Sequence, residues 1–392
     1  MSMIGPMSTL NGTNGTNGTN GTNGTNGTNG TNGTNGTNGT NALGGYSGWV
    51  TNPLLATALN RTRRDLVPPG TSPVWPFNPI KDWTRGVYGR PALNDGLPEF
   101  DRGDYLTLWD PGTRFFLSHV ELLRGVDFRL EKADAACVLT IDGQDAVTIH
   151  RPTKEKFKLA LPSVRNWATQ RDERMPEILT QVTPQWAFWA SIVSLHPERN
   201  RWTIELMQCA LQFAMLITQR MKHALACPRP IEYDPTLQPI VLTPSYGTYP
   251  GGHAVEAWMF ARVFAALTCQ RSGEEGNAML DALERLSVRI TENRVVAGLH
   301  FAVDGAAGFV LGELLAEYFV ARCAARADPL DARTFDGREF DPSDDFIDSS
   351  GVYDGTLATK GITTVTLDRA SGLMSSLWAL ARAEWVAQGF HP

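Results

Sequence analysis

Residues 201–226 read RWTIELMQCALQFAMLITQRMKHALA. Between residues 202 and 217 they are apolar on nearly every side of a helix, which indicates a helix buried in a protein core. Asn200 can cap the start of this helix, and Pro228 and Pro230 prevent its continuation. This segment therefore predicts a core built from helices.

The segments on both sides extend the helical pattern. Thr183 followed by Pro184 is typical of a helix start, because threonine caps well and proline fits the first turn. The pattern around Gly298 leaves open whether the helices on either side of it are continuous or kinked. Several apolar helices with short connections predict a mainly α fold with a helical bundle core. Further helices are predicted downstream over residues 252–270, 277–299, 300–325 and 368–388.

The N-terminal part has a different character. Residues 11–40 are ten consecutive copies of Asn-Gly-Thr and contain nothing apolar to bury, so we expect a disordered tail there. Residues 114–124 are rich in branched and aromatic side chains, which favours a strand. Residues 137–150 are predicted to form a hairpin, because Asp142-Gly143 is a pair typical of its turn.

These patterns divide the chain into four predicted regions. They are a disordered repeat tail (1–41), an irregular and strand-containing N-terminal region (42–182), a helical catalytic core (183–326), and an acidic loop with a C-terminal helix (327–392). The predicted strands lie in the second region, and the residues from which a catalytic site could be built lie in the third.

Composition narrows the class of protein. The net charge of −6 argues against non-specific attraction to nucleic acid, so a bound anion must be attracted by a local group of cations. The five cysteines are odd in number and widely spaced, which fits neither a disulfide framework nor a zinc site. Residues 1–10 lack the parts of a signal peptide, and the uncharged stretch 206–219 is too short to span a membrane. We therefore expect a soluble, cytoplasmic protein.

Two groups of residues at predicted helix ends suggest an oxyanion site. Lys222 lies in the last turn of a buried helix and Arg229 in the proline-bounded loop after it, so both cations can point into one cleft. Residues 250–253, Pro-Gly-Gly-His, begin the next predicted helix. Gly251 and Gly252 let the backbone approach a ligand closely, and a helix start offers unpaired N–H groups.

A third group adds a histidine and a carboxylate. His300 and Asp304 are four residues apart, so they share a helical face and the carboxylate can hold one imidazole nitrogen. The other nitrogen is then positioned as a nucleophile or a metal ligand. Arg294, about two turns before His300, adds a third cation, and His253 can transfer a proton across a bound anion.

The three groups form an ordered pattern, Lys-x6-Arg-Pro, then Pro-x-Gly-His, then Arg-x5-His-x3-Asp. This pattern resembles the signature of the superfamily that joins the type 2 phosphatidic acid phosphatases with the vanadium-dependent haloperoxidases. The resemblance covers residues 222–304. It implies an all-helical core. It also implies that Lys222, Arg229 and Arg294 neutralise the oxygens of phosphate or vanadate, with help from the Gly252 N–H.

The same resemblance assigns the chemistry. His300 would attack phosphorus in a phosphatase or bind vanadium in a haloperoxidase, His253 would be the general acid, and Asp304 would orient His300. The chain departs from the family at Gly251, where the motif normally has serine. The missing hydroxyl would be worth about 1.5–3 kcal/mol if it bonded a charged oxygen. A water molecule or Ser245 could replace it; otherwise the anion affinity is reduced or the pocket is adapted to another substrate.

The favoured interpretation is a vanadium-dependent haloperoxidase-like enzyme. It would hold vanadate at His300 and use hydrogen peroxide to oxidise a halide, which then modifies a small organic acceptor. Tyr249 and Ala254, which flank the second motif, resemble the haloperoxidase version. The alternative is a soluble acid phosphatase, a phosphoric monoester hydrolase with His300 as nucleophile. A third interpretation, favoured only by Gly251, is an inactive or vanadium-independent descendant that binds an anion. Apolar helix faces leave room for a homodimer.

Overall fold

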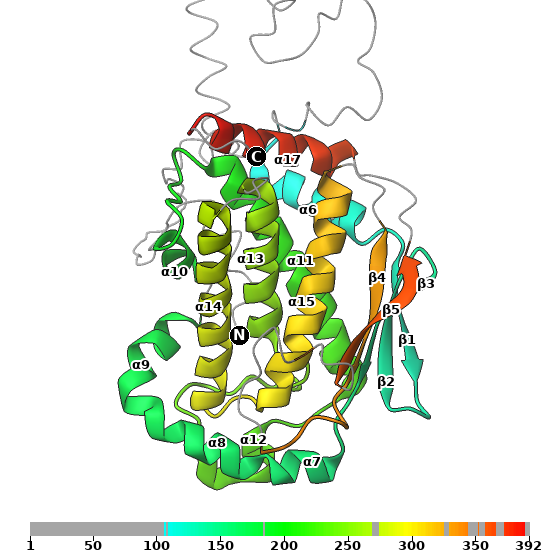
Figure 1. The fold of residues 1–392 in the computed structure, drawn as a ribbon, viewed down its shortest axis with the longest axis vertical. Helices are drawn as coiled ribbons and strands as arrows, with labels where there is room; N and C mark the ends of the chain where they lie inside the picture. The colour runs from blue at the N-terminus through cyan, green and yellow to red at the C-terminus, as the bar shows by residue number, and fades with distance from the viewer. Residues whose placement is uncertain are drawn as a thin grey trace, which may run out of the picture. The chain divides into compact units, whose positions relative to one another are not determined.

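The computed structural model describes residues 106, 109–182, 185–268, 274–324, 329–343, 352, 357–365 and 372–388. The repeat tail, nearly all of the segment up to residue 108, and Thr183-Pro184 lie outside these residues, so the predictions made for them stay predictions. Figure 1 shows the elements along the chain. They are α6 (Pro111–Leu122), β1 (Val126–Glu131), β2 (Ala136–Ile141), β3 (Gln144–His150), α7 (Lys154–Leu159), α8 (Leu161–Trp167), η3 (Ala168–Gln170), α9 (Arg171–Thr180), α10 (Trp186–Ala190), α11 (Arg201–Leu225), α12 (Pro230–Tyr233), η4 (Pro235–Leu237), α13 (Gly252–Thr268), α14 (Glu274–Val296), α15 (Ala302–Cys323), β4 (Leu330–Asp336), β5 (Ala358–Val365) and α17 (Gly372–Val386).

The long helices α11, α13, α14, α15 and α17 form the core. α13 packs against α11, α14 and α15, and α17 lies across the ends of α11 and α15 (Figure 1). α13 and α15 bury residues on nearly every side, as expected for helices surrounded by other elements. α11 begins and ends as its apolar pattern predicts. The mainly α fold is therefore confirmed.

Glycines set the distance between α13 and α15. A Cβ atom on Gly308 would lie 2.7 Å from the Cβ of Ala254, and one on Gly312 would lie 2.8 Å from the carbonyl oxygen of Val255. Such distances leave no room for a side chain at Gly308 or Gly312. The backbone of α15 therefore packs directly against Ala254 and Val255 of α13. This close contact brings the first turns of α13 and α15 together.

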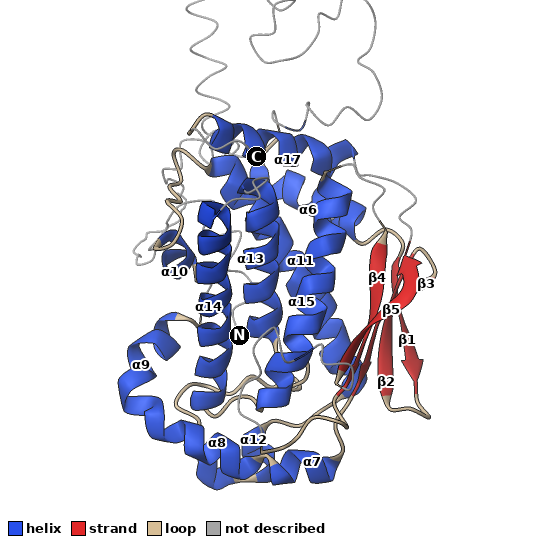
Figure 2. Ribbon diagram, in the orientation of Figure 1, coloured by secondary structure: helices blue, strands red, loops and turns tan. Residues whose placement is uncertain are grey.

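Five strands among the described residues form one sheet in the order β1-β2-β3-β4-β5 (Figure 2). β3 and β4 are parallel, and the other neighbouring pairs are antiparallel. Because β3 ends at His150 and β4 begins at Leu330, the bundle helices α11 to α15 lie in the connection between these two adjacent strands. The predicted hairpin over 137–150 is confirmed, and Asp142 and Gly143 in its turn have φ values of 49° and 80°.

The strand predicted over residues 114–124 is wrong, because most of this segment belongs to helix α6. The buried positions include Phe115, Ser118, His119 and Leu122, a spacing of three and four residues that a helix places on one face. The branched and aromatic side chains of the segment favour a strand locally. Packing of one helical face against the core outweighs that preference.

Other elements were not expected from the sequence. Residues 154–180 form the short helices α7, α8 and α9, and strands β4 and β5 lie in a part expected to hold only acidic turns and a helix. β4 is ordered by pairing with β3, which is far away in the sequence. Around Gly298 the two helices are separate, because α14 ends at Val296 and α15 begins at Ala302. Gly298 itself has a φ of 82°, which favours glycine and ends the helix.

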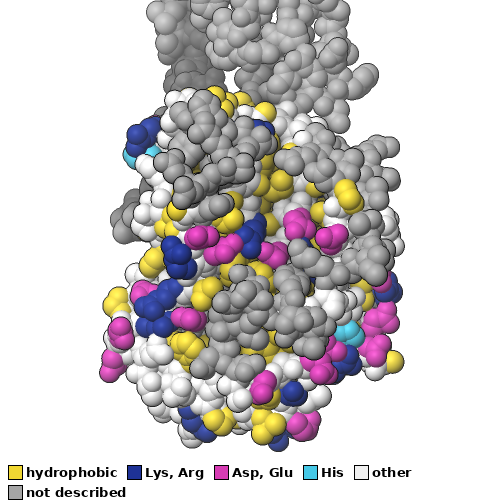
Figure 3. All heavy atoms as spheres, in the orientation of Figure 1, with side chains coloured by type: hydrophobic (Ala, Val, Ile, Leu, Met, Phe, Trp, Pro, Cys, Tyr) yellow, Lys and Arg dark blue, Asp and Glu magenta, His cyan; other side chains and the backbone are white. Residues whose placement is uncertain are grey.

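The surface carries mixed charge. On the face shown in Figure 3, basic and acidic side chains of the described residues are interspersed, as expected for a protein with a small net charge. Within the described residues, no helix combines the length and the apolar character needed to cross a membrane.

Candidate active site

The predicted site residues meet where four core helices end. The C-terminal ends of α11 and α14 lie beside the N-terminal ends of α13 and α15, at the lower end of the bundle in Figure 1. Helix starts carry a partial positive charge and unpaired N–H groups, which favour a bound anion. The loop before α13 and the loop between α14 and α15 contribute the remaining groups.

His300 is held through one ring nitrogen. Its Nδ1 lies 2.9 Å from Asp304 Oδ2 and 2.9 Å from Thr248 Oγ1. The Thr248 hydroxyl also donates to Asp304, and the Phe301 N–H donates to the same carboxylate oxygen at 2.9 Å. Since the single Thr248 proton goes to the carboxylate, the proton between Thr248 and His300 must be on Nδ1. His300 is therefore the tautomer that carries its lone pair on Nε2.

The environment keeps His300 neutral. Burial, followed by the nearby cations of Arg229, Lys222 and Arg294, holds the pKa of His300 well below 6.5. Burial also raises the pKa of Asp304 to about 6, although bonds from Thr248 and Phe301 oppose that shift. At neutral pH the pair is thus a carboxylate bonded to a neutral imidazole, the arrangement that a nitrogen nucleophile requires.

Arg229 faces the free nitrogen of His300. Its Nη1 lies 3.4 Å from His300 Nε2 and donates to the Leu299 carbonyl at 3.0 Å. Its Nε donates to the Tyr246 carbonyl at 2.9 Å, and its guanidinium lies over the Tyr246 ring. Arg229 is 1% exposed, so its charge acts in a poorly solvated place and attracts an anion strongly.

Lys222 is buried at the end of α11 beside the loop that precedes α13. Its Nζ donates to the carbonyls of Gly247 at 3.1 Å and Thr248 at 2.5 Å. Burial, with a smaller contribution from Arg229, lowers the pKa of Lys222 to about 7. Glu256 attracts Lys222 electrostatically, and burial raises the pKa of the Glu256 carboxyl to about 7. The charge of Lys222 is therefore sensitive to pH near neutrality.

Arg294 lines the pocket and contacts the end of α9. Its Nη2 donates to the Ile178 carbonyl at 3.2 Å and to Gln181 Oε1 at 3.2 Å, both at the end of α9. Among the described residues its buried Nε has no hydrogen-bond partner. Burial lowers the pKa of Arg294 to about 10, which leaves it charged at neutral pH. The site therefore keeps at least one unused cationic donor.

His253 lies in the first turn of α13. Its Nε2 is 3.0 Å from the Gln181 carbonyl, so this nitrogen carries a proton and donates it. Burial, Arg294 and His300 hold the pKa of His253 well below 6.5. The ring is thus neutral when no anion is bound, and a negative ligand beside it would favour its protonation.

The glycine pair before His253 has two separate roles. The Gly251 N–H donates to the Asp304 carbonyl at 2.8 Å, and a Cβ atom on Gly251 would lie 2.9 Å from that oxygen. At Gly252 a Cβ would meet only the Lys222 Cε, at 3.8 Å. Gly251 is thus required by the contact with α15. The N–H of Gly252 starts α13 without an intrahelical partner, which leaves it available to an anion.

We expect Gly251→Ser to destabilise the protein and not to tighten anion binding. The serine Cβ would press on the Asp304 carbonyl, and overpacking of this kind costs about 1–3 kcal/mol. Urea unfolding measures the loss, with Gly252→Ala as the matched control at an open neighbouring position. An unchanged unfolding free energy for Gly251→Ser would contradict this interpretation of the α13–α15 contact.

A small pocket gives access to the site. Its lining includes both histidines and Arg294, and its other residues are mainly apolar. The lining residues are Gly251, His253, Ala254, Thr291, Arg294, Val295, His300, Phe301 and Gly305.

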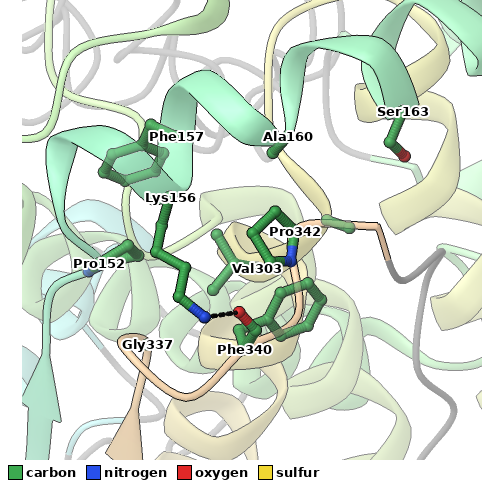
Figure 4. A pocket seen from close by; sticks show the side chains of 10 residues that line it. Pro152, Lys156, Phe157, Ala160, Ser163, Val303, Gly337, Phe340 and Pro342 are labelled. Atoms are coloured by element: carbon green, nitrogen blue, oxygen red, sulfur yellow. Dashed lines mark hydrogen bonds between the residues drawn. The ribbon is translucent and has the colours of Figure 1, made fainter.

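A second pocket lies beside the first turn of α15 (Figure 4). Its charged side chain is Lys156, whose Nζ donates to the Phe340 carbonyl at 2.9 Å. Phe157 on its wall packs against Phe301, with ring centroids 4.9 Å apart. Among its described lining residues there is no second charged group, so we place the candidate active site at the first pocket.

Comparison with known proteins agrees with this geometry. The model of the PAP2 superfamily matches residues 206–327, which include all the predicted site residues. We call residues 206–327, which match this superfamily, the PAP2 region. The superfamily resemblance inferred from the motifs is confirmed, and the match does not single out the haloperoxidase branch.

The chain was also compared with solved structures and with curated proteins. One similar solved structure is a transmembrane phosphatidylglycerolphosphate phosphatase of the PAP2 type from Bacillus subtilis. It is 17% identical, with a TM-score of 0.27, over 53% of this chain and 93% of that one. A search of curated proteins finds no match.

Two residues that contact the site were not predicted from the sequence, Thr248 in the PAP2 region and Gln181 before it. Thr248 joins His300 to Asp304, and Gln181 contacts both His253 and Arg294. Neither belongs to the three motifs, and Gln181 lies before the matched region. Ser245, expected as a replacement for the missing serine, is exposed. The hydroxyl beside His300 belongs to Thr248.

Proposed function

We propose that the PAP2 region hydrolyses phosphoric monoesters, with His300 as the nucleophile. The observation that carries the proposal is the state of His300. Its Nδ1 is committed to Thr248 and Asp304, while its Nε2 keeps a lone pair beside Arg229. A buried, neutral and oriented imidazole is suited to attack an electrophile that arrives as an anion.

Cations around the pocket supply the binding of the phosphoryl oxygens. Arg294 lines the pocket, Arg229 and Lys222 lie near His300, and all three lower the pKa of His300 by their charge. The N–H of Gly252 adds a backbone donor. Placed where negative charge is concentrated, such groups stabilise both the bound ester and the transition state.

The reaction then follows in two steps. His300 Nε2 forms a bond to phosphorus as the ester P–O bond breaks, and the leaving oxygen takes a proton from His253. In the second step a water gives a proton to His253 and attacks phosphorus, which breaks the N–P bond and releases inorganic phosphate. Because His253 Nε2 is bonded to a carbonyl, Nδ1 is the atom that exchanges these protons.

Vanadate is the cofactor of the second candidate function, a haloperoxidase. It resembles phosphate in charge and shape, so the donors that suit phosphate also suit vanadate. His300 would hold it, with Lys222, Arg229 and Arg294 around its oxygens. Bound vanadate would activate hydrogen peroxide toward halide. The support for this candidate is the resemblance of Tyr249 and Ala254 to the haloperoxidase motif, which is narrower than the support for hydrolysis.

Two assays on one preparation separate the two functions. We expect release of phosphate from p-nitrophenyl phosphate without added vanadate, and inhibition of that release by vanadate. The second assay measures bromination of monochlorodimedone with vanadate, bromide and hydrogen peroxide. Bromination without phosphatase activity would reverse the choice, and absence of both activities would reject both candidates.

The site also predicts a pH dependence. Hydrolysis needs a protonated Lys222 to bind the anion and a protonated His253 to release the alcohol. The pKa of Lys222 is lowered to about 7 and that of His253 lies well below 6.5. Both groups lose their protons as the pH rises, so log(kcat/KM) is expected to fall above pH 7 with a slope of about −2.

Arginine at position 222 stays charged, so log(kcat/KM) of Lys222→Arg should fall with a slope of only about −1 over the same pH range. Lys156→Arg is the matched control, because Lys156 lines the second pocket and not the first, and it should keep the wild-type slope. Identical slopes in wild type and Lys222→Arg would exclude Lys222 as the titrating group.

A further inference from the structure

Gln181 ends helix α9 and lies between two residues of the site. It is completely buried and precedes the region matched by the PAP2 superfamily. Its side-chain Oε1 accepts hydrogen bonds from Arg294 Nη2 at 3.2 Å and Asn293 Nδ2 at 3.0 Å. Its backbone carbonyl accepts one from His253 Nε2 at 3.0 Å. One residue thus contacts the predicted general acid and an anion-binding cation.

Ion pairs fix Gln181 in this place by attaching α9 to α14. Glu177 accepts two hydrogen bonds from Arg289, at 2.8 and 2.7 Å, and one from Asn293 at 2.9 Å. One turn earlier, Arg174 pairs with Glu292 at 2.7 Å. The end of α9 is therefore held against α14 from several directions, and Gln181 has little freedom to move.

We infer that Gln181 is a positioning residue, which sets the tautomer of His253 and the direction of the Arg294 guanidinium. The inference rests on the proposed function for the roles of those two residues. A carbonyl can only accept, so it selects the His253 tautomer with the proton on Nε2 and leaves Nδ1 for proton transfer. The Gln181 Oε1 holds Nη2 of Arg294 on the α9 side.

The second contact has a consequence for anion binding. With Nη2 engaged by α9, Arg294 keeps its buried Nε without a partner among the described residues, and its side chain lines the pocket. Gln181 therefore helps hold a guanidinium whose remaining donors can serve the ligand. Outer groups that orient a ligand-binding side chain in this way commonly contribute about tenfold to a hundredfold.

The tautomer is tested on the wild-type protein without ligand. In protein labelled with ¹⁵N-histidine, the ring nitrogen shifts of His253 distinguish a proton on Nε2 from one on Nδ1, and His253→Gln assigns the signal. We expect the Nε2–H form at pH 7. An Nδ1–H form would overturn the role of the Gln181 carbonyl, whatever the enzyme's activity.

The side-chain contact is tested by calorimetry with inorganic phosphate. Gln181→Met keeps the shape but removes the acceptor, and we expect phosphate to bind about tenfold more weakly. Arg262→Ala is the matched control, because it removes the ion pairs of α13 with Glu284 and Glu313 without contacting Gln181 or Arg294. It should lower the melting temperature and leave phosphate affinity nearly unchanged.

The two variants separate positioning from simple support. An equal loss of phosphate affinity in both variants, or no loss in Gln181→Met, would overturn the assignment for Arg294. If wild type binds phosphate as expected but hydrolyses no ester, the proposed function fails while these binding results still decide the role of Gln181. If wild type binds no phosphate, the proposed site fails with it, and the tautomer measurement still decides the contact with His253.

Discussion

His300→Ala is expected to reduce kcat for p-nitrophenyl phosphate hydrolysis by at least roughly 10³-fold. The substitution removes the ring nitrogen, Nε2 of His300, that attacks phosphorus in the proposed mechanism. The cations that bind the anion stay in place, so inorganic phosphate should still inhibit or bind to the variant. We therefore expect the variant to lose nearly all turnover and to keep most of its affinity for phosphate.

The matched control is His223→Ala. His223 lies next to Lys222 on α11 but is exposed, so its removal should leave turnover unchanged. A direct measurement adds to the kinetics: wild type quenched in acid-free conditions during turnover should carry phosphate on histidine, and His300→Ala should carry none. Wild-type turnover in His300→Ala would show that the nucleophile is elsewhere.

The spacing of the motifs made much of this site predictable. His300 and Asp304 are four residues apart, and their contact follows from local geometry at the start of α15. Lys222 and Arg229 flank one helix end, so their proximity to the site is also a local property. The same holds for the helix start that carries His253. The proximity of residues that are close in sequence and placed at helix ends could therefore be predicted from the amino-acid sequence alone.

Contacts between distant segments could not be predicted in this way. Thr248 meets Asp304 across 56 residues, and Gln181 meets Arg294 across 113. Neither has a spacing that marks it, because each contact depends on how α9, α13, α14 and α15 pack. The parallel pairing of β3 with β4 was missed for the same reason, since nothing in the β4 segment alone reveals its partner.

Gly251 shows how packing changes the meaning of a residue. From the sequence, a glycine in place of serine indicates a lost hydroxyl and a weaker anion site. In the structure, the position has no room for any Cβ, because the Asp304 carbonyl lies against it. The absence of the serine is thus explained by the close approach of α13 and α15, a distance that Gly308 and Gly312 also maintain.

Asp304→Asn is also expected to separate catalysis from binding. Three donors meet on one oxygen of this carboxylate: His300 Nδ1, the Thr248 hydroxyl and the Phe301 N–H. An amide can keep all three bonds only if its oxygen takes that place, and it then supplies no negative charge to stabilise a positive imidazole. If the amide nitrogen takes the place, the proton of His300 moves to Nε2 and the lone pair that attacks phosphorus is lost.

Either orientation lowers kcat, by roughly 10²- to 10⁴-fold if the loss resembles that of other buried carboxylate–histidine pairs. Phosphate affinity should be retained or increased, because a negative charge near the anion has been removed while Lys222, Arg229 and Arg294 remain. Asp145→Asn is the control, an exposed carboxylate on β3 that pairs with Arg129 and should change neither quantity. A variant that lost phosphate binding in proportion to kcat would show that Asp304 supports the anion-binding groups instead of orienting His300. Retained binding with lost turnover would place its effect on the nucleophile alone.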